Sequence, residues 1–263
     1  MKLMMKKEKY GARLNPLDPR DYPVSDLIDA ASLPHAPTQT HVDYSGLLGQ
    51  VHYQGGVPSC TAFATAHQIY LFEQINKYPR ISFPSPAFIY SGTRYWTQSL
   101  GGKQWRDGDK LIFEGTYPRA AYQWVSKMGT CAEDLWPYSE RKSNLNKLPD
   151  RKQLKGARGR KGLSYYTVDT ARFENVMLML DQGFPPTLTV SVTPQWYGAN
   201  SEDELVWKNG TEEVEGYHRV CAIGYKDGFI KVANSWKGVE YLWLNEDWIE
   251  QDAADITVVT RMK

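Results

Sequence analysis

Residues 54–63 read QGGVPSCTAF, a loop that runs directly into a helical pattern. The two glycines and the proline favour the loop. Beyond them, apolar residues recur at spacings of three and four, which predicts a helix with Ser59 as its N-cap. Cys60 therefore lies where the loop enters the helix, and the partial positive charge of a helix N-terminus favours the thiolate form of such a cysteine. A lone cysteine at a helix start is more often structural, so a reactive thiol requires partners elsewhere in the chain.

Residues 217–236 contain candidate partners for this thiol. Two apolar runs, 220–225 and 229–233, are separated by Lys226-Asp227-Gly228, which is a hairpin signal. His218 stands just before the first run and Asn234 just after the second. A strand, a tight turn and a returning strand should place these two residues side by side at one end of the hairpin.

These residue types fit nucleophilic catalysis. An imidazole is a suitable base because its pKa lies near neutrality. We expect the Asn234 amide to hold His218 in one tautomer, with Trp236 shielding that contact from water. The side-chain amide of Gln54 and the backbone N–H of Cys60 would then stabilise a developing oxyanion.

The composition excludes several other classes of protein. The 263 residues include 31 Lys plus Arg and 30 Asp plus Glu, so the formal charge is +1 and a globally basic nucleic-acid binder is not expected. No apolar run is long enough for a membrane span. Three cysteines are too few, and odd in number, for a disulfide framework. No Cys/His spacing suggests zinc.

The N-terminal residues MKLMMKKEKY contain no apolar stretch of signal-peptide length, which predicts a cytoplasmic protein. In that reducing compartment the three thiols would stay free. Residues 1–35 are polar and rich in proline, and each proline disfavours helix in the residue before it. They are therefore predicted to form an extended arm that lies on the body of the protein.

The rest of the chain divides into helical patterns followed by strand patterns. Helices are predicted near residues 85–97, 118–128 and 170–182, and strands near 187–192, 220–225, 229–233, 240–244 and 256–260. This order suggests two packed lobes of α+β type. Residues 141–161 carry nine basic residues and one acid, which indicates a lobe boundary or exposed connector. The alternative is a weak docking site for an anionic surface, including nucleic acid, although interleaved aromatic residues are lacking.

Three motifs together resemble those of the papain-like cysteine peptidases: residues 54–63, the run YHRVCAIGY at 217–225, and NSW at 234–236. The resemblance extends to VDYS at 42–45, to Gly115 with the helical run 120–125, and to EDLWPY at 133–138. In all, roughly residues 40 to 250 match the family's order of motifs.

The resemblance implies a papain-like two-lobe α+β fold, with a helical left lobe, a β-barrel-like right lobe and the active-site cleft between them. The expected divisions are an arm or short leader at 1–40, the left lobe at 41–150 and the right lobe at 151–263. The implied activity is that of an endopeptidase that hydrolyses polypeptides through a thioester acyl-enzyme, without a metal or a cofactor. A bacterial or phage source is our expectation, from the missing signal peptide and the missing disulfide cysteines.

The resemblance also assigns roles to individual residues. Cys60 would be the nucleophile, His218 its ion-pair partner and the acid for the leaving amine, Asn234 the residue that orients His218, and Gln54 the oxyanion donor. Those implied to bind substrate are Gly115 and Trp236.

The sequence departs from the family at several of these motifs. Val57 replaces a usual cysteine, so one family disulfide cannot form, and Pro58 stiffens the loop where glycine is usual. Thr61 replaces the usual tryptophan after the nucleophile, and Tyr217 replaces a small or polar residue before the base. The N-terminal segment is also shorter than the family's inhibitory propeptides, so we predict that it packs on the body rather than filling the cleft.

Two other functions remain open from the sequence. The first is a binding or scaffold protein that uses the same fold without catalysis. The second is an amidase or crosslink-modifying acyl transferase built on the same residues. Fast, selective labelling of Cys60 by iodoacetamide near pH 6, lost in His218→Ala, would favour an enzyme over a scaffold.

Overall fold

The computed structural model describes residues 10–18, 21–79, 82–99, 106–107, 110–111, 114–169, 172–206 and 213–261. The β-rich lobe is built on one sheet in the order β4-β10-β5-β7-β8-β9-β6, to which β1 adds by pairing with β7. All pairs are antiparallel except β6 with β9. The strands are β1 (Val42–Asp43), β4 (Leu163–Thr167), β5 (Thr187–Val192), β6 (Asp203–Leu205), β7 (Gly216–Lys226), β8 (Phe229–Trp236), β9 (Val239–Asn245) and β10 (Asp255–Arg261).

The hairpin between β7 and β8 has the expected geometry. Asp227 and Gly228 form the two-residue turn with φ of 49° and 80°, and positive φ at both positions is the requirement of the turn that best fits strand twist. The register pairs Tyr225 with Ile230 and Cys221 with Ala233. The predicted hairpin is thus confirmed, and it brings the two ends of residues 217–236 together.

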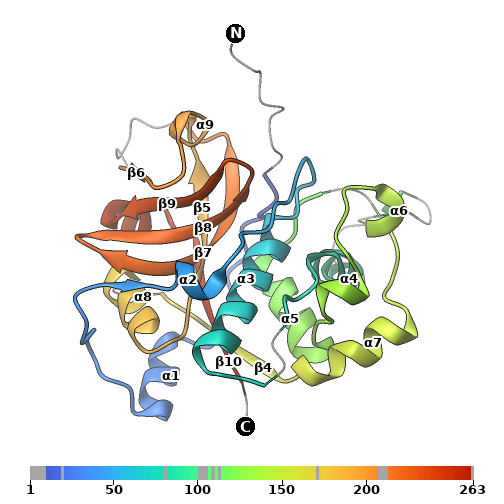
Figure 1. The fold of residues 1–263 in the computed structure, drawn as a ribbon, viewed down its shortest axis with the longest axis horizontal. Helices are drawn as coiled ribbons and strands as arrows, with labels where there is room; N and C mark the ends of the chain where they lie inside the picture. Colours follow the sequence, from blue (N-terminus) through green and yellow to red (C-terminus); the bar gives the residue numbers. More distant parts are fainter. Residues whose placement is uncertain are drawn as a thin grey trace.

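The helical lobe is built around α3 (Cys60–Ile75), which stands between the sheet on one side and the helices of residues 86–157 on the other (Figure 1). Thirteen of its sixteen residues are buried, because β7 covers one side while α4 (Pro86–Ser99) and α5 (Pro118–Met128) cover another. The remaining short elements are α2 (Ser45–Leu48), β2 (Arg106–Asp107), β3 (Lys110–Leu111), η1 (Glu133–Leu135), α6 (Lys142–Leu145), α7 (Arg151–Ala157), η2 (Arg158–Arg160), α9 (Pro194–Gly198) and η3 (Trp248–Asp252).

The predicted helices and strands are observed with small shifts of their ends. The prediction of a helix at 118–128 matches α5, and that at 170–182 corresponds to α8 (Arg172–Asp181), with residues 170–171 outside the described part of the chain. The observed helices and the large sheet agree with the predicted α+β class. The lobe boundary near residue 150 stays a prediction, since Ala157 after it still packs in the helical core while β4 pairs with β10.

The prediction of an extended N-terminal arm is wrong for part of its length. The segment contains helix α1 (Val24–Ala31). Pro23 precedes this helix and Pro34 follows it, so the prolines bound a window in which nothing disfavours a helix. Val24, Leu27 and Ile28 fall on one face at spacings of three and four, and they are buried in the core of the sheet. Among the described residues, no helix is long and apolar enough to cross a membrane.

Candidate active site

Cys60 is the first residue of α3, as predicted, and is completely buried. The nearby backbone of Arg219, Gly11 and Thr61 lowers the pKa of the thiol. Burial has the larger effect and raises that pKa to about 11. The expectation of a thiolate is therefore wrong for this form of the protein, because desolvation outweighs the helix N-terminus and the hydrogen bonds.

His218 and Asn234 lie side by side, as the hairpin predicts. His218 Nε2 is 2.8 Å from Asn234 Oδ1, and Asn234 Nδ2 donates to the carbonyl oxygen of Val239 at 2.9 Å. The second bond fixes which way the amide faces, so His218 must carry its proton on Nε2 and donate it to Oδ1. Nδ1 is left as the unprotonated nitrogen, and it is buried without a hydrogen-bond partner among the described residues.

Aromatic rings enclose this histidine. The centroid of the Trp236 ring lies 4.7 Å from that of the imidazole, and Trp196 meets the imidazole edge-on at 5.8 Å. Trp236 is only 5% exposed. Burial lowers the pKa of His218 to about 4, so the imidazole is neutral near pH 7. The observed contact fits the expected shielding by Trp236, while its role in binding substrate stays a prediction.

Gln54 is tied to the β-rich lobe beside Asn234. Its backbone N–H donates to the carbonyl oxygen of Ser235 at 3.0 Å, and its Oε1 accepts from Ser235 Oγ at 2.7 Å. Its Nε2, which carries two hydrogens, donates to the carbonyl oxygen of Val57 at 2.8 Å. These bonds hold Gln54 between the loop before Cys60 and the strand that carries Asn234, and its role as an oxyanion donor stays a prediction.

Residues 10–13 lie directly against these site residues, so the prediction that the N-terminal segment avoids the cleft is wrong for this part of it. Gly11 O accepts from Thr116 N at 2.7 Å, and Arg13 N donates to Thr116 O at 3.0 Å. On the other side, Ala12 N donates to Tyr217 O at 3.3 Å. The sequence motifs of the site give no indication of this contact, because it is made almost entirely by backbone atoms.

Two glycines permit this close approach. A Cβ on Gly115 would lie 2.4 Å from Gly11 O, and a Cβ on Gly11 would lie 2.3 Å from the carbonyl carbon of Pro58. Two side-chain pairs extend the contact: Tyr10 Oη donates to Glu215 at 2.8 Å, and Arg13 forms an ion pair with Glu114. Gly115 therefore lies directly against the backbone of the arm, and its role in binding substrate stays a prediction.

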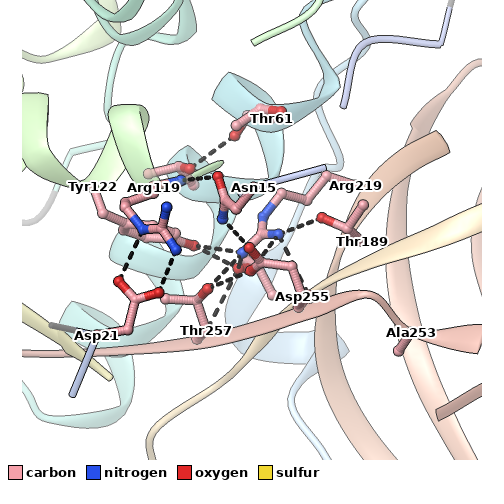
Figure 2. A network of polar contacts seen from close by, with 12 residues as sticks. Asn15, Asp21, Thr61, Arg119, Tyr122, Thr189, Arg219, Ala253, Asp255 and Thr257 are labelled. Atoms are coloured by element: carbon pink, nitrogen blue, oxygen red, sulfur yellow. Dashed lines mark hydrogen bonds and ion pairs between the residues drawn. The ribbon is translucent and has the colours of Figure 1, made fainter. Parts of the chain in front are cut away.

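The sequence did not single out two further residues near His218. Trp196 comes from α9, far from the motifs, and no local pattern marks it as an aromatic cover. Arg219 directly follows His218 and is also completely buried. Its guanidinium occupies a network with Asp255 and Tyr122 (Figure 2). Because successive side chains of a strand point to opposite faces, this network lies on the other face of β7 from His218.

The other predicted features lie away from this site. Most basic side chains of residues 141–161 are exposed on α6, α7 and η2, whereas Arg160 is buried in an ion pair with Glu73. No group of three His, Cys, Asp or Glu residues in the described ranges could hold a metal ion. All three cysteines are free.

No protein-family model matches the chain. A search of curated proteins finds an uncharacterized peptidase C1-like protein of Acanthamoeba polyphaga mimivirus, 31% identical over 201 residues. The match covers 70% of this chain and 58% of that relative, so the chain spans little more than half of the relative's length.

Solved structures of cysteine peptidases share the fold. Xylellain, a cysteine protease from Xylella fastidiosa, is 26% identical, with 98% of each chain covered and a TM-score of 0.77. Procathepsin L 3 of the Tenebrio molitor larval midgut is 16% identical, with 86% of this chain and 71% of that chain covered and a TM-score of 0.67. The chain therefore shares the papain-like fold of these cysteine proteases and is similar in sequence to a peptidase C1-like protein.

Proposed function

We propose that this protein is a cysteine endopeptidase in which Cys60 is the nucleophile and His218 the base. The observation that carries the proposal is the state of His218: Asn234 holds one ring nitrogen, and the other is buried with its lone pair unused. A nitrogen in that state is available to take a proton from a thiol. The contact of Cys60 with the backbone of Arg219 supports the closeness of the nucleophile to this strand.

In the proposed reaction, the Cys60 proton passes to His218 Nδ1 as sulfur attacks the carbonyl carbon of the scissile peptide. Gln54 Nε2 and the backbone N–H of Cys60 stabilise the oxyanion. The protonated Nδ1 then donates to the leaving amine, and a thioester remains. Water attacks that thioester, its proton goes to Nδ1, and the carboxylic acid product leaves with Cys60 restored as a thiol.

Residues 10–13 favour a polypeptide substrate over a side-chain amide or crosslink. They bind by backbone hydrogen bonds to Thr116 and Tyr217, and only an extended main chain presents donors and acceptors with that spacing. We infer that substrate backbone uses the same atoms, with Gly115 giving it room. A non-catalytic scaffold would have no need for the unused lone pair on His218.

The same contacts support an inhibitory role for the arm in this form of the protein. The backbone of Gly11 lies beside the loop before Cys60, since a Cβ on Gly11 would lie 2.3 Å from the carbonyl carbon of Pro58. In this form burial favours the neutral thiol and the neutral imidazole. We propose that residues 10–13 must be displaced or removed before substrate binds.

The test is hydrolysis of an unstructured polypeptide by the chain without residues 1–17, which keeps α1, compared with the full chain. We expect new peptide termini with the shortened chain, a much lower rate with the full chain, and none with Cys60→Ala in the shortened chain. Release of ammonia from side-chain amides without new termini would instead indicate an amidase. No product from any substrate, with the fold intact, would favour the scaffold.

We also propose that the protein acts in a reducing compartment such as the cytoplasm. Its three cysteines are all free and all buried, and none is paired. The exposed basic side chains of residues 141–161 support a second, weaker proposal, which is a low affinity for anionic surfaces. Activity that persists at millimolar reductant and is lost on mild oxidation would support the reducing compartment.

A further inference from the structure

The loop that leads to Cys60 contains two adjacent glycines, Gly55 and Gly56. Gly55 has a φ of 60°, which residues with a side chain rarely adopt, and glycine leaves the backbone free to take many other conformations. An oxyanion donor has to be held at one place beside the reacting atoms. Contacts from outside the loop must therefore fix the position of Gln54.

Gln54 is held from both lobes and is completely buried. On the side of the β-rich lobe, Ser235 accepts the backbone N–H of Gln54 and donates its hydroxyl to Gln54 Oε1. On the side of the helical lobe, the hydroxyl of Tyr138 donates to the backbone carbonyl oxygen of Gln54 at 2.7 Å. Tyr138 is thus the counterpart of Ser235 across the loop.

The single hydroxyl proton of Tyr138 determines the direction of its second hydrogen bond. That proton goes to the Gln54 carbonyl oxygen, which can only accept. Ser59 Oγ lies 2.9 Å from Tyr138 Oη, so Ser59 is the donor of that bond. A chain of hydrogen bonds therefore runs from the residue before Cys60, through Tyr138, to Gln54. Each donor in such a chain polarises the next and strengthens it.

Tyr138 is itself fixed in place. Its backbone N–H donates to Glu133 Oε1 at 2.8 Å. Its ring meets the ring of Phe63 edge-on, with the centroids 4.7 Å apart. Phe63 belongs to the first turn of α3, so the hydroxyl of Tyr138 has a defined position relative to Cys60.

Glu140, two residues further along, holds the glycines of the loop. Its Oε2 accepts the backbone N–H of Gly56 at 2.8 Å, and a charged acceptor makes this a strong bond. The carboxyl group also fills the space beside Gly55, where a Cβ would lie 2.2 Å from Glu140 Cδ. The segment 138–140 therefore contacts the loop both before and after its most permissive residue.

We propose that Tyr138 and Glu140 are positioning residues for the proposed hydrolysis: together they hold the loop of residues 54–59 so that the Gln54 side chain meets the developing oxyanion. The inference rests on the proposed function, which assigns the oxyanion to Gln54. The effect of both residues is confined to reactions that form an oxyanion, and the reactivity of the Cys60 thiol itself does not depend on them. A merely structural role would change both alike.

The test compares two reactions of Cys60 in the full chain. Iodoacetamide alkylates the sulfur at a saturated carbon, without an oxyanion. p-Nitrophenyl acetate transfers its acetyl group to the sulfur through a tetrahedral oxyanion and releases p-nitrophenolate. Both small reagents must pass residues 10–13, so the cover of the arm cancels in the ratio of the acetylation rate to the alkylation rate. Peptide mapping locates each product, and Cys60→Ala gives the background.

We expect Tyr138→Phe to be alkylated within about twofold of the wild type and acetylated about tenfold more slowly. Loss of a whole oxyanion donor costs about 100-fold or more, and this variant only misplaces one. Tyr44→Phe is the matched control, because it loses a comparable bond to the carbonyl oxygen of Leu180 at 2.8 Å. Its ratio should equal that of the wild type. In a Gln54→Ala background, Tyr138→Phe should change the ratio by less than about twofold, because the side chain that it positions is absent.

Three results would overturn the proposal: an unchanged ratio in Tyr138→Phe, an equal fall in Tyr44→Phe, or a tenfold effect that persists in Gln54→Ala. If Tyr138→Phe does not fold, Glu140 provides the decision, because its side chain is exposed. Glu140→Ala should lower the ratio about threefold, and Glu140→Gln, which keeps an acceptor for the N–H of Gly56, should restore it. Equal ratios in these two variants overturn the proposal.

The two reagents also separate this inference from the proposed function, since neither reaction needs a peptide substrate. Absence of peptide hydrolysis together with the expected fall of the ratio in Tyr138→Phe would contradict the endopeptidase alone. Peptide hydrolysis together with a constant ratio would contradict the positioning role alone.

Discussion

Two buried histidines of this protein differ in one respect that decides what each can do. His67, in the middle of α3, and His218, on β7, are both almost completely buried, and burial lowers the pKa of the first to about 3 and of the second to about 4. Burial and pKa therefore do not distinguish them. Their hydrogen bonds do: His67 Nε2 accepts the backbone N–H of His52 at 3.2 Å, whereas the acceptor nitrogen of His218 has no partner among the described residues.

The comparison shows that a candidate base is distinguished by a ring nitrogen whose lone pair accepts no hydrogen bond. The lone pair on His67 Nε2 stabilises the loop before α3, and the ring is further fixed among aromatic neighbours, including Phe63 and Phe83. In His218, by contrast, Nε2 donates to Asn234 Oδ1, while Nδ1 accepts no hydrogen bond from the described residues. A buried polar atom without a partner is costly, so its presence in a well-packed site points to a role in chemistry.

The largest expected effect separates the two histidines directly. His218→Ala should lower peptide hydrolysis by the arm-shortened chain by about 10⁴-fold, since a nucleophile without its base retains only the contribution of binding and the oxyanion donors. His67→Gln, which keeps an acceptor, should leave the turnover number within a few-fold while lowering the melting temperature. Initial rates and thermal unfolding of both variants check this. Equal loss of turnover in both would break the comparison.

Asn234→Ala tests how the lone pair is placed on Nδ1. Without the acceptor Oδ1, the proton is no longer held on Nε2, so we expect turnover to fall by about 100-fold with the fold intact. Circular dichroism and steady-state rates provide the measurement. Unfolding of this variant would show that the residue is structural, and Gln182→Ala, a partly buried amide away from the site, serves as the matched control.

The pH dependence of stability should respond to both histidines. Each has a folded-state pKa below its unfolded value of about 6.5, so the unfolded state binds more protons at acid pH. Stability from this source is complete above pH 6.5 and falls with pH, down to about 4 for His218 and about 3 for His67. The expected loss is about 1.4 kcal/mol per pH unit for each histidine. Urea unfolding between pH 7 and 4 should show a shallower slope in His67→Gln, and an unchanged slope would contradict the burial of a neutral ring.

The smallest expected effect concerns residues 10–13 of the arm, which limit the access of reagents to the site. Arg13→Ala removes a partly exposed ion pair with Glu114, and such pairs contribute at most about 1 kcal/mol. Cys60 of the full chain should therefore react with iodoacetamide up to about fivefold faster in Arg13→Ala than in the wild type, and Arg13→Lys should stay close to the wild type. Reaction of the wild-type chain as fast as that of the arm-shortened chain would contradict the cover.

Much of the fold and of the candidate site follows from the sequence because local signals carry it. The turn at Asp227-Gly228 fixes the hairpin, and the hairpin fixes the meeting of His218 with Asn234. The Pro118 start and Gly129 stop of α5 are equally local. The motif that contains Gln54 and Cys60 precedes the motifs that contain His218 and Asn234. This order along the chain, rather than any one segment, indicates which residues form the site.

The features that the sequence did not predict depend on contacts between distant segments. Residues 10–13 reach the site through backbone atoms, which leave no mark in the side-chain pattern. The sequence predicts a thiolate at Cys60, but burial raises the pKa of this thiol. Burial depends on all the segments packed around Cys60 and not on the helix start alone. In the sequence, Arg219 is a charged residue in an apolar strand. Its burial is possible because threonines and an aspartate from two other strands accept its hydrogen bonds.

The arm has a consequence for any affinity measured on the full chain. Because residues 10–13 are joined covalently to the body through α1, they behave as a tethered ligand with an effective concentration in the millimolar range, whatever the amount of protein. Under the proposed inhibition, a free substrate competes with this constant internal ligand, so its apparent KM is multiplied by one plus the closed-to-open ratio of the arm, and dilution of the protein leaves that factor unchanged. Ratios of KM among substrates will be the same for the full and the shortened chain, while every absolute value is higher for the full chain.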